Sequence, residues 1–147
     1  MGTPPPDELL LRELGQLIRQ LTRLVGGADD GPAMTATQRI ALVELGEEGP
    51  LRLNDLAKRM GTSTPTASRS VDALEALGLV KRAPESSDRR ALSIDVTEQG
   101  RHLLDERLRR AAEAFKPAAA TLSADDRRDL QALLRRLTDA LRAVGTD

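Results

Sequence analysis

The segment LGLVKRAPESSDRRALSIDVTEQG, which runs from Leu77 to Gly100, decides the fold of this 147-residue chain. Residues 79–83 predict one β-strand, and residues 92–96 alternate apolar with polar side chains, as expected for a second strand with one buried face. The connection PESSDRR then predicts an exposed loop. A turn that only reversed the chain would need Gly, Pro, Asn or Ser and no pair of guanidinium groups. The hairpin therefore indicates that the Asp-Arg-Arg run at residues 88–90 has a task beyond reversing the chain.

Two short helices joined by a tight turn precede the hairpin, and together they predict a helix-turn-helix. In NDLAKRMG, Asn54 is the expected cap of the first helix and Gly61 is the expected turn. In TSTPTASRSVDALEALG, Ser63 is the expected cap of the second helix, and Pro65 is tolerated because it falls in the first turn. We expect Gly78 to end this helix in the left-handed conformation.

A further helix is predicted ahead of this pair, in the segment TATQRIALVELGEEGP. Thr35 and Gln38 have the spacing of a capping box at its start. The residues that we expect it to bury are Ile40, Leu42, Val43 and Leu45.

The second helix of the pair has two contrasting faces at 100° per residue. One face carries Ala67, Ser70, Val71, Leu74 and Leu77, and the other carries Pro65, Ser68, Arg69, Asp72 and Ala76. Short side chains and hydroxyls allow close approach to the major groove of DNA, where an arginine can bind guanine O6 and N7. The helix N-terminus adds backbone N–H groups for a phosphate. Taken alone, this pattern is equally compatible with an ordinary solvated face behind a Ser/Thr-rich cap.

The overall charge argues against a nucleic-acid partner, but its distribution does not. The formal net charge is −1 and the isoelectric point about 5.9, whereas nucleic-acid-binding domains commonly exceed about 9. From residue 58 to residue 90, however, seven basic residues stand against four acidic ones. The predicted helix-turn-helix and hairpin therefore share a locally basic surface.

Composition excludes several classes of function. The chain has no Cys, so it has no disulfide, cysteine nucleophile or thiol redox sensor, and its single histidine, His102, cannot form a metal site alone. No phosphate-binding glycine loop or paired catalytic carboxylates stand out, so we expect no enzyme activity, catalytic residue, metal or cofactor. No apolar run approaches a membrane span, and the N-terminus lacks the features of a signal peptide. We expect a single soluble, cytoplasmic domain with an aliphatic core, because aromatic residues are 1% of the chain.

Leucine seams at heptad spacing mark both ends of the chain. The first helix, which Gly26 and Gly27 are expected to end, carries Leu10, Leu14, Leu17, Leu21 and Leu24. The last helix, capped by Ser123, carries Leu130, Leu134, Leu137, Leu141 and Val144, and a helix opened by Thr97 carries Leu104, Leu108, Ala111 and Phe115. These seams suit either one intramolecular core or a helical dimer interface. We favour the dimer, because a narrow seam suits contact between two helices better than a globular core.

The run Asp88-x-Arg90, followed by Thr97-x-x-Gly100 and preceded by LGLVKR, resembles the wing motif of the multiple antibiotic resistance regulator (MarR) family of bacterial transcription factors. The order of helices and hairpin resembles that family over nearly the whole chain. The resemblance implies that Arg90 enters the minor groove and that Asp88 orients it. It places Thr64, Pro65, Thr66, Ser68 and Arg69 on the recognition helix, and Ser63, Arg82 and Arg89 complete our candidate DNA contacts.

The expected molecule is mainly α-helical with a small β-hairpin wing, an α+β winged helix-turn-helix. Residues 35–100 would form the DNA-binding lobe, and residues 7–27 and 101–145 a helical dimerisation region within the single chain 1–147. The expected dimer contacts are Leu10, Leu14, Leu17, Leu21, Leu130, Leu134, Leu137 and Leu141. The expected function is repression of transcription by a homodimer on a pseudo-palindromic operator in double-stranded DNA. The alternative is a winged-helix adaptor that binds proteins and no DNA.

The family's thiol-based oxidant sensors use a cysteine and its metal sensors use several ligands, and this chain departs from both patterns. Two alternatives remain: a small organic acid or other apolar ligand, or no ligand. A ligand would occupy a leucine-lined cavity with an arginine at its edge.

Overall fold

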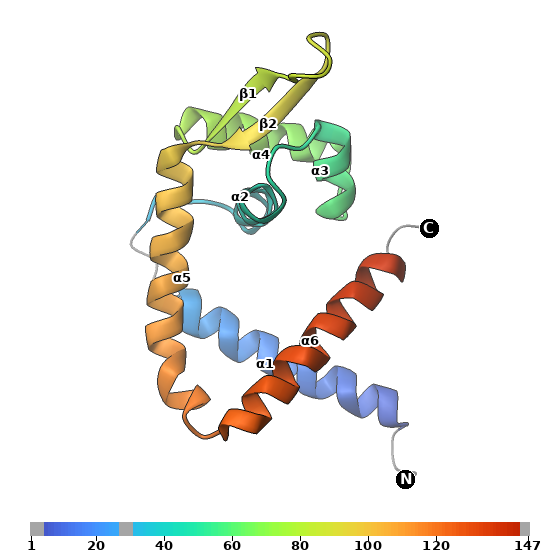
Figure 1. Cartoon of the computed structure of the whole chain (residues 1–147), viewed down its shortest axis with the longest axis vertical. Helices are drawn as coiled ribbons and strands as arrows, with labels where there is room; N and C mark the ends of the chain where they lie inside the picture. Colours follow the sequence, from blue (N-terminus) through green and yellow to red (C-terminus); the bar gives the residue numbers. More distant parts are fainter. Residues whose placement is uncertain (1–4, 27–30, 145–147) are drawn as a thin grey trace.

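A computed structural model of the chain describes residues 5–26 and 31–144. The described residues form six α-helices and one antiparallel two-stranded hairpin, which confirms the predicted winged-helix fold class (Figure 1). The elements are α1 (Pro6–Gly26), α2 (Ala36–Glu48), α3 (Leu53–Arg59), α4 (Thr64–Ala76), β1 (Val80–Pro84), β2 (Leu92–Val96), α5 (Glu98–Ala119) and α6 (Ala124–Val144). Residues 27 and 145, which bound the two predicted dimerisation segments, lie outside the described residues.

The hydrophobic core lies in the lobe built from α2, α3, α4 and the hairpin. It contains only aliphatic side chains and methionine, as the composition predicted: Met34, Ala41, Leu42, Leu45, Leu56, Val71, Leu74, Leu79, Val80, Ile94 and Val96. Helix α2 contacts both α4 and β2, so the three helices and the hairpin share one interior. Burial of these side chains, at about 25 cal/mol per Å² of apolar surface, is what holds the recognition helix against the rest of the lobe.

Helix α2 begins with the predicted capping box: the Thr35 side chain accepts from the backbone N–H of Gln38, and the Gln38 side chain accepts from the backbone N–H of Thr35. The buried side of α2 consists of Ala41, Leu42 and Leu45. The predicted burial of Ile40 and Val43 was wrong, because both side chains are exposed. Helix α2 is apolar on more than one side, so periodicity alone could not select the buried one.

Helix α3 begins two residues earlier than expected, with Arg52 rather than Asn54 at the N-cap. The preceding residue, Leu51, exchanges two backbone hydrogen bonds with Ile94 of β2, at 3.0 and 2.8 Å, and this bridge fixes where the helix starts. Asn54 therefore lies in the first turn, where its Oδ1 accepts a 3.2 Å hydrogen bond from the Thr64 hydroxyl. The side chain that was predicted to cap α3 instead ties it to the start of α4.

The hairpin is close to its prediction. Strand β2 has the expected bounds, and β1 begins and ends one residue later than expected, with Val80 paired to Val96 and Pro84 paired to Leu92. Ile94 and Val96 are buried, as predicted from the alternation. Leu92 is exposed, because it is the first residue of β2, at the loop end of the hairpin and away from the core.

The junction of α4, the hairpin and α5 explains the Thr97-x-x-Gly100 spacing. The Thr97 hydroxyl donates a 2.6 Å hydrogen bond to the Gly78 carbonyl and accepts one from the backbone N–H of Gly100, which caps α5. A Cβ on Gly100 would lie 2.2 Å from the carbonyl oxygen of Leu79, so only glycine fits there. Gly78 has φ of +73° and ends α4 as predicted. These contacts fix the base of the hairpin to both flanking helices.

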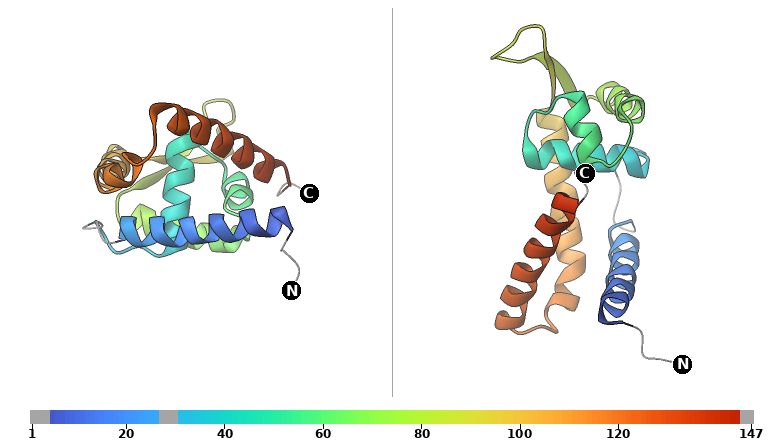
Figure 2. Two further views of the ribbon diagram at one scale, coloured as in Figure 1. Left: turned by 90° about the horizontal axis from the view of Figure 1, so that it is seen from below. Right: turned by 90° about the vertical axis from the view of Figure 1, so that its right-hand side faces the viewer.

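The remaining helices extend below the lobe. Helix α5 runs from the base of the hairpin away from the lobe, α1 contacts α5, and α6 returns toward the lobe (Figures 1 and 2). Neither α1 nor α6 buries any residue. Across residues 5–26 and 31–144, no helix combines the length and the apolar character that a membrane span requires.

Candidate nucleic-acid interface

Helix α4 presents the face that the sequence predicted. Its N-cap Ser63 accepts a 3.3 Å hydrogen bond from the backbone N–H of Thr66 and donates a 2.9 Å one to its hydroxyl. Thr64, Pro65 and Arg69 are exposed, while Thr66 and Ser68 are half-buried. The opposite side of the helix is buried through Ala67, Ser70, Val71 and Leu74, whereas Leu77 lies at the C-cap and is exposed. The small polar residues therefore stand at the N-terminal end of an exposed helix face.

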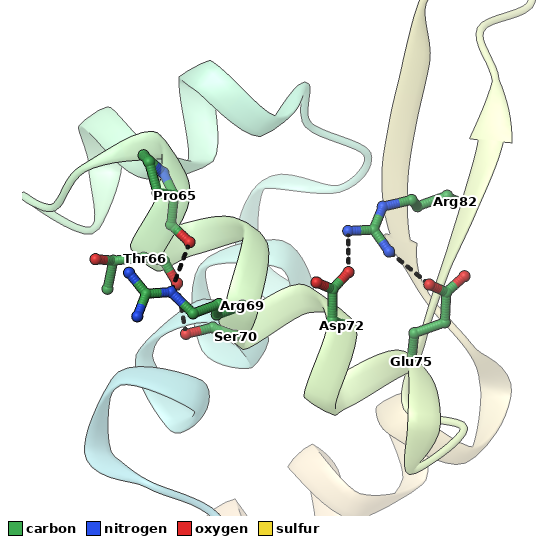
Figure 3. A network of polar contacts seen from close by, with 7 residues as sticks. All are labelled: Pro65, Thr66, Arg69, Ser70, Asp72, Glu75 and Arg82. Atoms are coloured by element: carbon green, nitrogen blue, oxygen red, sulfur yellow. Dashed lines mark hydrogen bonds and ion pairs between the residues drawn. The ribbon is translucent and has the colours of Figure 1, made fainter.

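Arg69 is held loosely on this face. Its Nε donates a 3.3 Å hydrogen bond to the carbonyl oxygen of Pro65, one turn earlier (Figure 3). A long, exposed bond to a single backbone oxygen leaves the guanidinium able to turn toward a base edge. The Ser70 hydroxyl is used within the helix, because it donates to the carbonyl oxygen of Thr66.

The loop of the hairpin is closed by Asp88. Its Oδ1 accepts a 3.0 Å hydrogen bond from the backbone N–H of Arg90, and its carbonyl oxygen accepts one from the N–H of Ala91. Glu85 N–H donates to the carbonyl oxygen of Ala91, which completes the loop. The Asp88 carboxylate therefore orients Arg90 by a hydrogen bond to its backbone N–H and not by a contact with its guanidinium. Both Arg89 and Arg90 are exposed at the end of the hairpin.

Arg82 is placed differently from the other candidate contacts. Its side chain lies across α4, where one Nη donates to Asp72 at 2.7 Å and the other to Glu75 at 2.5 Å (Figure 3). The guanidinium is thereby committed to two carboxylates of the recognition helix. The sequence placed Arg82 among the candidate DNA contacts and did not predict its pairing with Asp72 and Glu75. The signal for that pairing was the spacing of the two acidic residues, which lie one turn apart on the helix that precedes the hairpin.

A second ion pair at the wing was also missed. Arg52, just before α3, donates from Nε and Nη2 to the two carboxylate oxygens of Glu85, at 2.8 and 2.7 Å. The hydrogen bond from Arg52 and its positive charge hold the pKa of Glu85 below its ordinary value. The two residues are far apart in sequence, and the Leu51–Ile94 bridge joins the segment before α3 to the hairpin that carries Glu85. This bidentate pair ties the start of the wing loop to the helix-turn-helix.

Several basic residues of the lobe stay exposed although others form ion pairs. Arg59 is paired with Glu48, and Arg82 with Asp72 and Glu75. The other basic residues between positions 58 and 90 are exposed, namely Lys58, Arg69, Lys81, Arg89 and Arg90. Within the described ranges, no group of three or more His, Cys, Asp or Glu side chains could hold a metal ion.

A cavity of about 750 Å³ lies between the lobe and the long helices. Its apolar lining comes from the end of α1, from α2 and from α5, through Val25, Val43, Leu104, Leu108 and Ala111. Three arginines also line it, namely Arg39, Arg101 and Arg107, together with two carboxylates, Glu47 and Asp105. The exposed Val43 of α2 thus contributes to this cavity and not to the core.

The leucine seams of α1 and α6 form exposed apolar surfaces. Leu10 is 54% exposed and Leu141 is 62% exposed, and Leu17, Leu130 and Leu134 are also exposed. Leu14, Leu21 and Leu137 are half-buried. Exposed leucines at this spacing are typical of helices that pack against another chain.

Comparisons with known proteins agree with this geometry. Residues 34–91, which span α2, the helix-turn-helix, β1 and the wing loop, match the profile of the MarR family. The HTH-type transcriptional repressor NicR of Pseudomonas putida is 30% identical over 109 residues, which cover 74% of this chain and 69% of NicR.

Solved structures extend the match to the long helices. The crystal structure of a probable transcriptional regulator from Pseudomonas aeruginosa is 32% identical, with a TM-score of 0.66 over 90% of this chain and 99% of that one. The structure of NadR in complex with 4-hydroxyphenylacetate is 25% identical, with a TM-score of 0.69 over 97% of this chain and 98% of NadR. The protein therefore belongs to the MarR family of transcriptional regulators and is not an enzyme.

Proposed function

We propose that this regulator represses transcription in the cytoplasm by binding a pseudo-palindromic operator as a homodimer. The observation that carries the proposal is the presence, in one lobe, of an exposed small-residue face on α4 and an arginine-tipped wing. The lobe comprises residues 35–100, and the segments 7–27 and 101–145 form the dimerisation region.

Each part of the lobe has a distinct role on DNA. The N-terminus of α4 enters the major groove, where Ser63, Thr64, Thr66 and Ser68 bind phosphates or bases and Arg69 binds a guanine. Pro65 keeps this end of the helix compact, so that it can approach the bases closely. The wing reaches the neighbouring minor groove, where Arg90 is attracted by the negative potential of a narrow A·T-rich stretch. Arg89, beside it, contacts the phosphate backbone.

Two lobes are needed to bind a palindrome, and the exposed seams support a dimer. Helices α1 and α6 bury no residue within one chain, yet they expose leucines at heptad spacing. A second copy would cover these leucines by a two-fold contact, which is the commonest symmetry among soluble oligomers. Because the two recognition helices then have a fixed separation, the dimer selects half-sites about one helical turn apart.

We further propose that a small organic acid releases the repressor from DNA. The cavity between lobe and long helices combines an apolar lining with three arginines against two carboxylates, and this excess of positive charge favours a ligand with a carboxylate attached to an apolar body. The similar protein NadR was crystallised with 4-hydroxyphenylacetate, a molecule of this chemistry. A ligand there biases the separation of the two lobes, and about 2.7 kcal/mol of differential binding would reduce DNA affinity a hundredfold.

The test begins with duplexes that the wild-type protein selects from a random-sequence pool. Fluorescence anisotropy titrations against salt should give a steep negative slope of log K, because several phosphates are neutralised on binding. Arg90→Ala should weaken binding at least about tenfold, whereas Arg128→Ala, which removes the same charge from exposed α6, should not. A protein that selects no duplex at moderate salt would instead be a protein-binding adaptor.

A further inference from the structure

The guanidinium of Arg82 joins the wing to the recognition helix. Arg82 lies at the centre of β1, directly opposite the buried Ile94. Its two Nη atoms bind Asp72 and Glu75, which stand one turn apart on α4 (Figure 3). The planar fork of an arginine can satisfy both carboxylates at once, which a lysine ammonium on a flexible stem cannot do with fixed geometry.

The exposed fractions of the side chains show that Arg82 is more enclosed than its partner Asp72. The Arg82 side chain is 25% exposed, whereas that of Asp72 is 62% exposed. The charge of Arg82 is therefore turned toward the two carboxylates of α4 and is less open to solvent than that of Asp72. A cation that served as a phosphate contact would be expected to present its guanidinium outward, as the exposed Arg90 does.

The outer end of β1 has a second attachment to the helix-turn-helix. Glu85, the first residue of the wing loop, is held by the bidentate contact from Arg52 at the N-cap of α3. Strand β1 is thus tied to α4 at its centre and to the start of α3 at its end. The end of the wing can be placed reproducibly only if both attachments hold.

We propose that Arg82 is a positioning residue, which fixes the wing on the recognition helix and so sets where Arg90 stands relative to Arg69. The proposal rests on the DNA binding and on the role of Arg90 proposed above. It gives Arg82 no contact with DNA.

The experiment uses the full-length protein, the duplex selected by the wild type, and anisotropy titrations over a range of salt. The first variant is the double substitution Asp72→Asn with Glu75→Gln, which removes the contact while Arg82 stays in place. Electrostatics alone predicts tighter DNA binding, because the change removes negative charge beside the DNA. Loss of positioning predicts the opposite sign, with binding about threefold weaker or worse.

The second variant is Arg82→Gln, with Lys81→Gln as its matched control, since Lys81 is the neighbouring exposed cation on the same strand. Arg82→Gln should weaken binding about tenfold without changing the salt slope. A lost phosphate contact would instead reduce the slope by about 0.9 for each half of the dimer. Each titration is then repeated in a protein that also carries Arg90→Ala. In that background the Asp72→Asn, Glu75→Gln double substitution, which leaves Arg82 charged, should cause no further loss of DNA affinity, because the wing no longer contributes to binding.

The titrations distinguish a positioning role of Arg82 from a direct DNA contact and from an absence of DNA binding. Tighter binding by the double variant, or an equal loss with and without Arg90, overturns the positioning role while leaving DNA binding intact. A reduced salt slope in Arg82→Gln makes Arg82 a phosphate contact and also overturns it. A wild type that selects no duplex, or an Arg90→Ala variant that binds normally, removes the proposed function and this inference with it. Should Arg82→Gln not fold, Arg82→Lys replaces it, with weaker binding expected only when Arg90 is present.

Discussion

Substitution of Gly100 by alanine should destabilise the protein by about 3 kcal/mol, although alanine favours helices more than glycine does. The added Cβ would lie 2.2 Å from the Leu79 carbonyl oxygen and 2.6 Å from Cγ1 of Val96. The carbonyl cannot rotate away, because it accepts a 3.0 Å hydrogen bond from the N–H of Thr97. Relief of the clash therefore requires α5 to move relative to the hairpin by about 1 Å, if an ordinary C···O contact of about 3.3 Å is to be restored.

The magnitude combines three contributions. Overpacking of a tight site costs about 1–3 kcal/mol. Weakening the two hydrogen bonds of Thr97 to Leu79 and Gly78 costs about 1 kcal/mol each. The higher helix propensity of alanine offsets about 1 kcal/mol.

Urea unfolding followed by far-ultraviolet circular dichroism measures the change, and the melting temperature should fall by roughly 6–12 °C. Gly26→Ala is the matched control, since a Cβ there meets nothing within 4 Å, and its stability should stay close to that of the wild type. If Gly100→Ala unfolds within about 0.5 kcal/mol of the wild type, the junction is not close-packed and our account of the Thr97-x-x-Gly100 spacing fails.

Three further outcomes are expected. Arg69→Ala should relax base preference at one major-groove position and cost about 1–3 kcal/mol there, which selection from random duplexes would detect. Leu134→Asp should convert the dimer to a monomer at micromolar concentration, since it places a charge in the apolar surface of α6; light scattering that finds a stable dimer would contradict the proposed interface. Arg52→Gln should raise the pKa of Glu85 toward its ordinary 4.5. In the wild type this pair stabilises the fold above that pH, and the stabilisation is lost as the pH falls through the lower folded pKa; the variant should lack it at every pH. A carboxyl titration of Glu85 by NMR that is unchanged in the variant would refute this prediction.

The local rules of the sequence predicted most of the fold because they involve neighbours along the chain. The capping box at Thr35 and the caps at Ser63 and Thr97 need only residues within one turn, and all three were confirmed. The alternation in β2 likewise needs one strand and one buried side. The start of α3 was misplaced because it depends on a bridge to Ile94, which no local pattern contains.

The sequence predicted which elements carry the candidate site, but it did not predict the ion pairs within that site. The exposed face of α4 and the wing arginines followed from periodicity and from the family resemblance. The partnership of Arg82 with two carboxylates depends on how the hairpin crosses α4, and that of Arg52 with Glu85 joins residues 33 positions apart. Charge counting treats all basic residues of the lobe alike, whereas the fold pairs Arg82 with two carboxylates of α4 and leaves Arg90 exposed.

Footprinting on the selected duplex locates both proposed DNA-contacting parts of the lobe, the recognition helix and the wing, in one experiment. Hydroxyl-radical cleavage should reveal a symmetric footprint with flanking minor-groove protections, and dimethyl sulphate should show guanine N7 protected in two half-sites about one helical turn apart. Arg90→Ala should lose the flanking protections and keep the guanine protections, whereas Arg69→Ala should lose the guanine protections and keep the flanking ones. A single asymmetric footprint, or flanking protections that persist without Arg90, would contradict it.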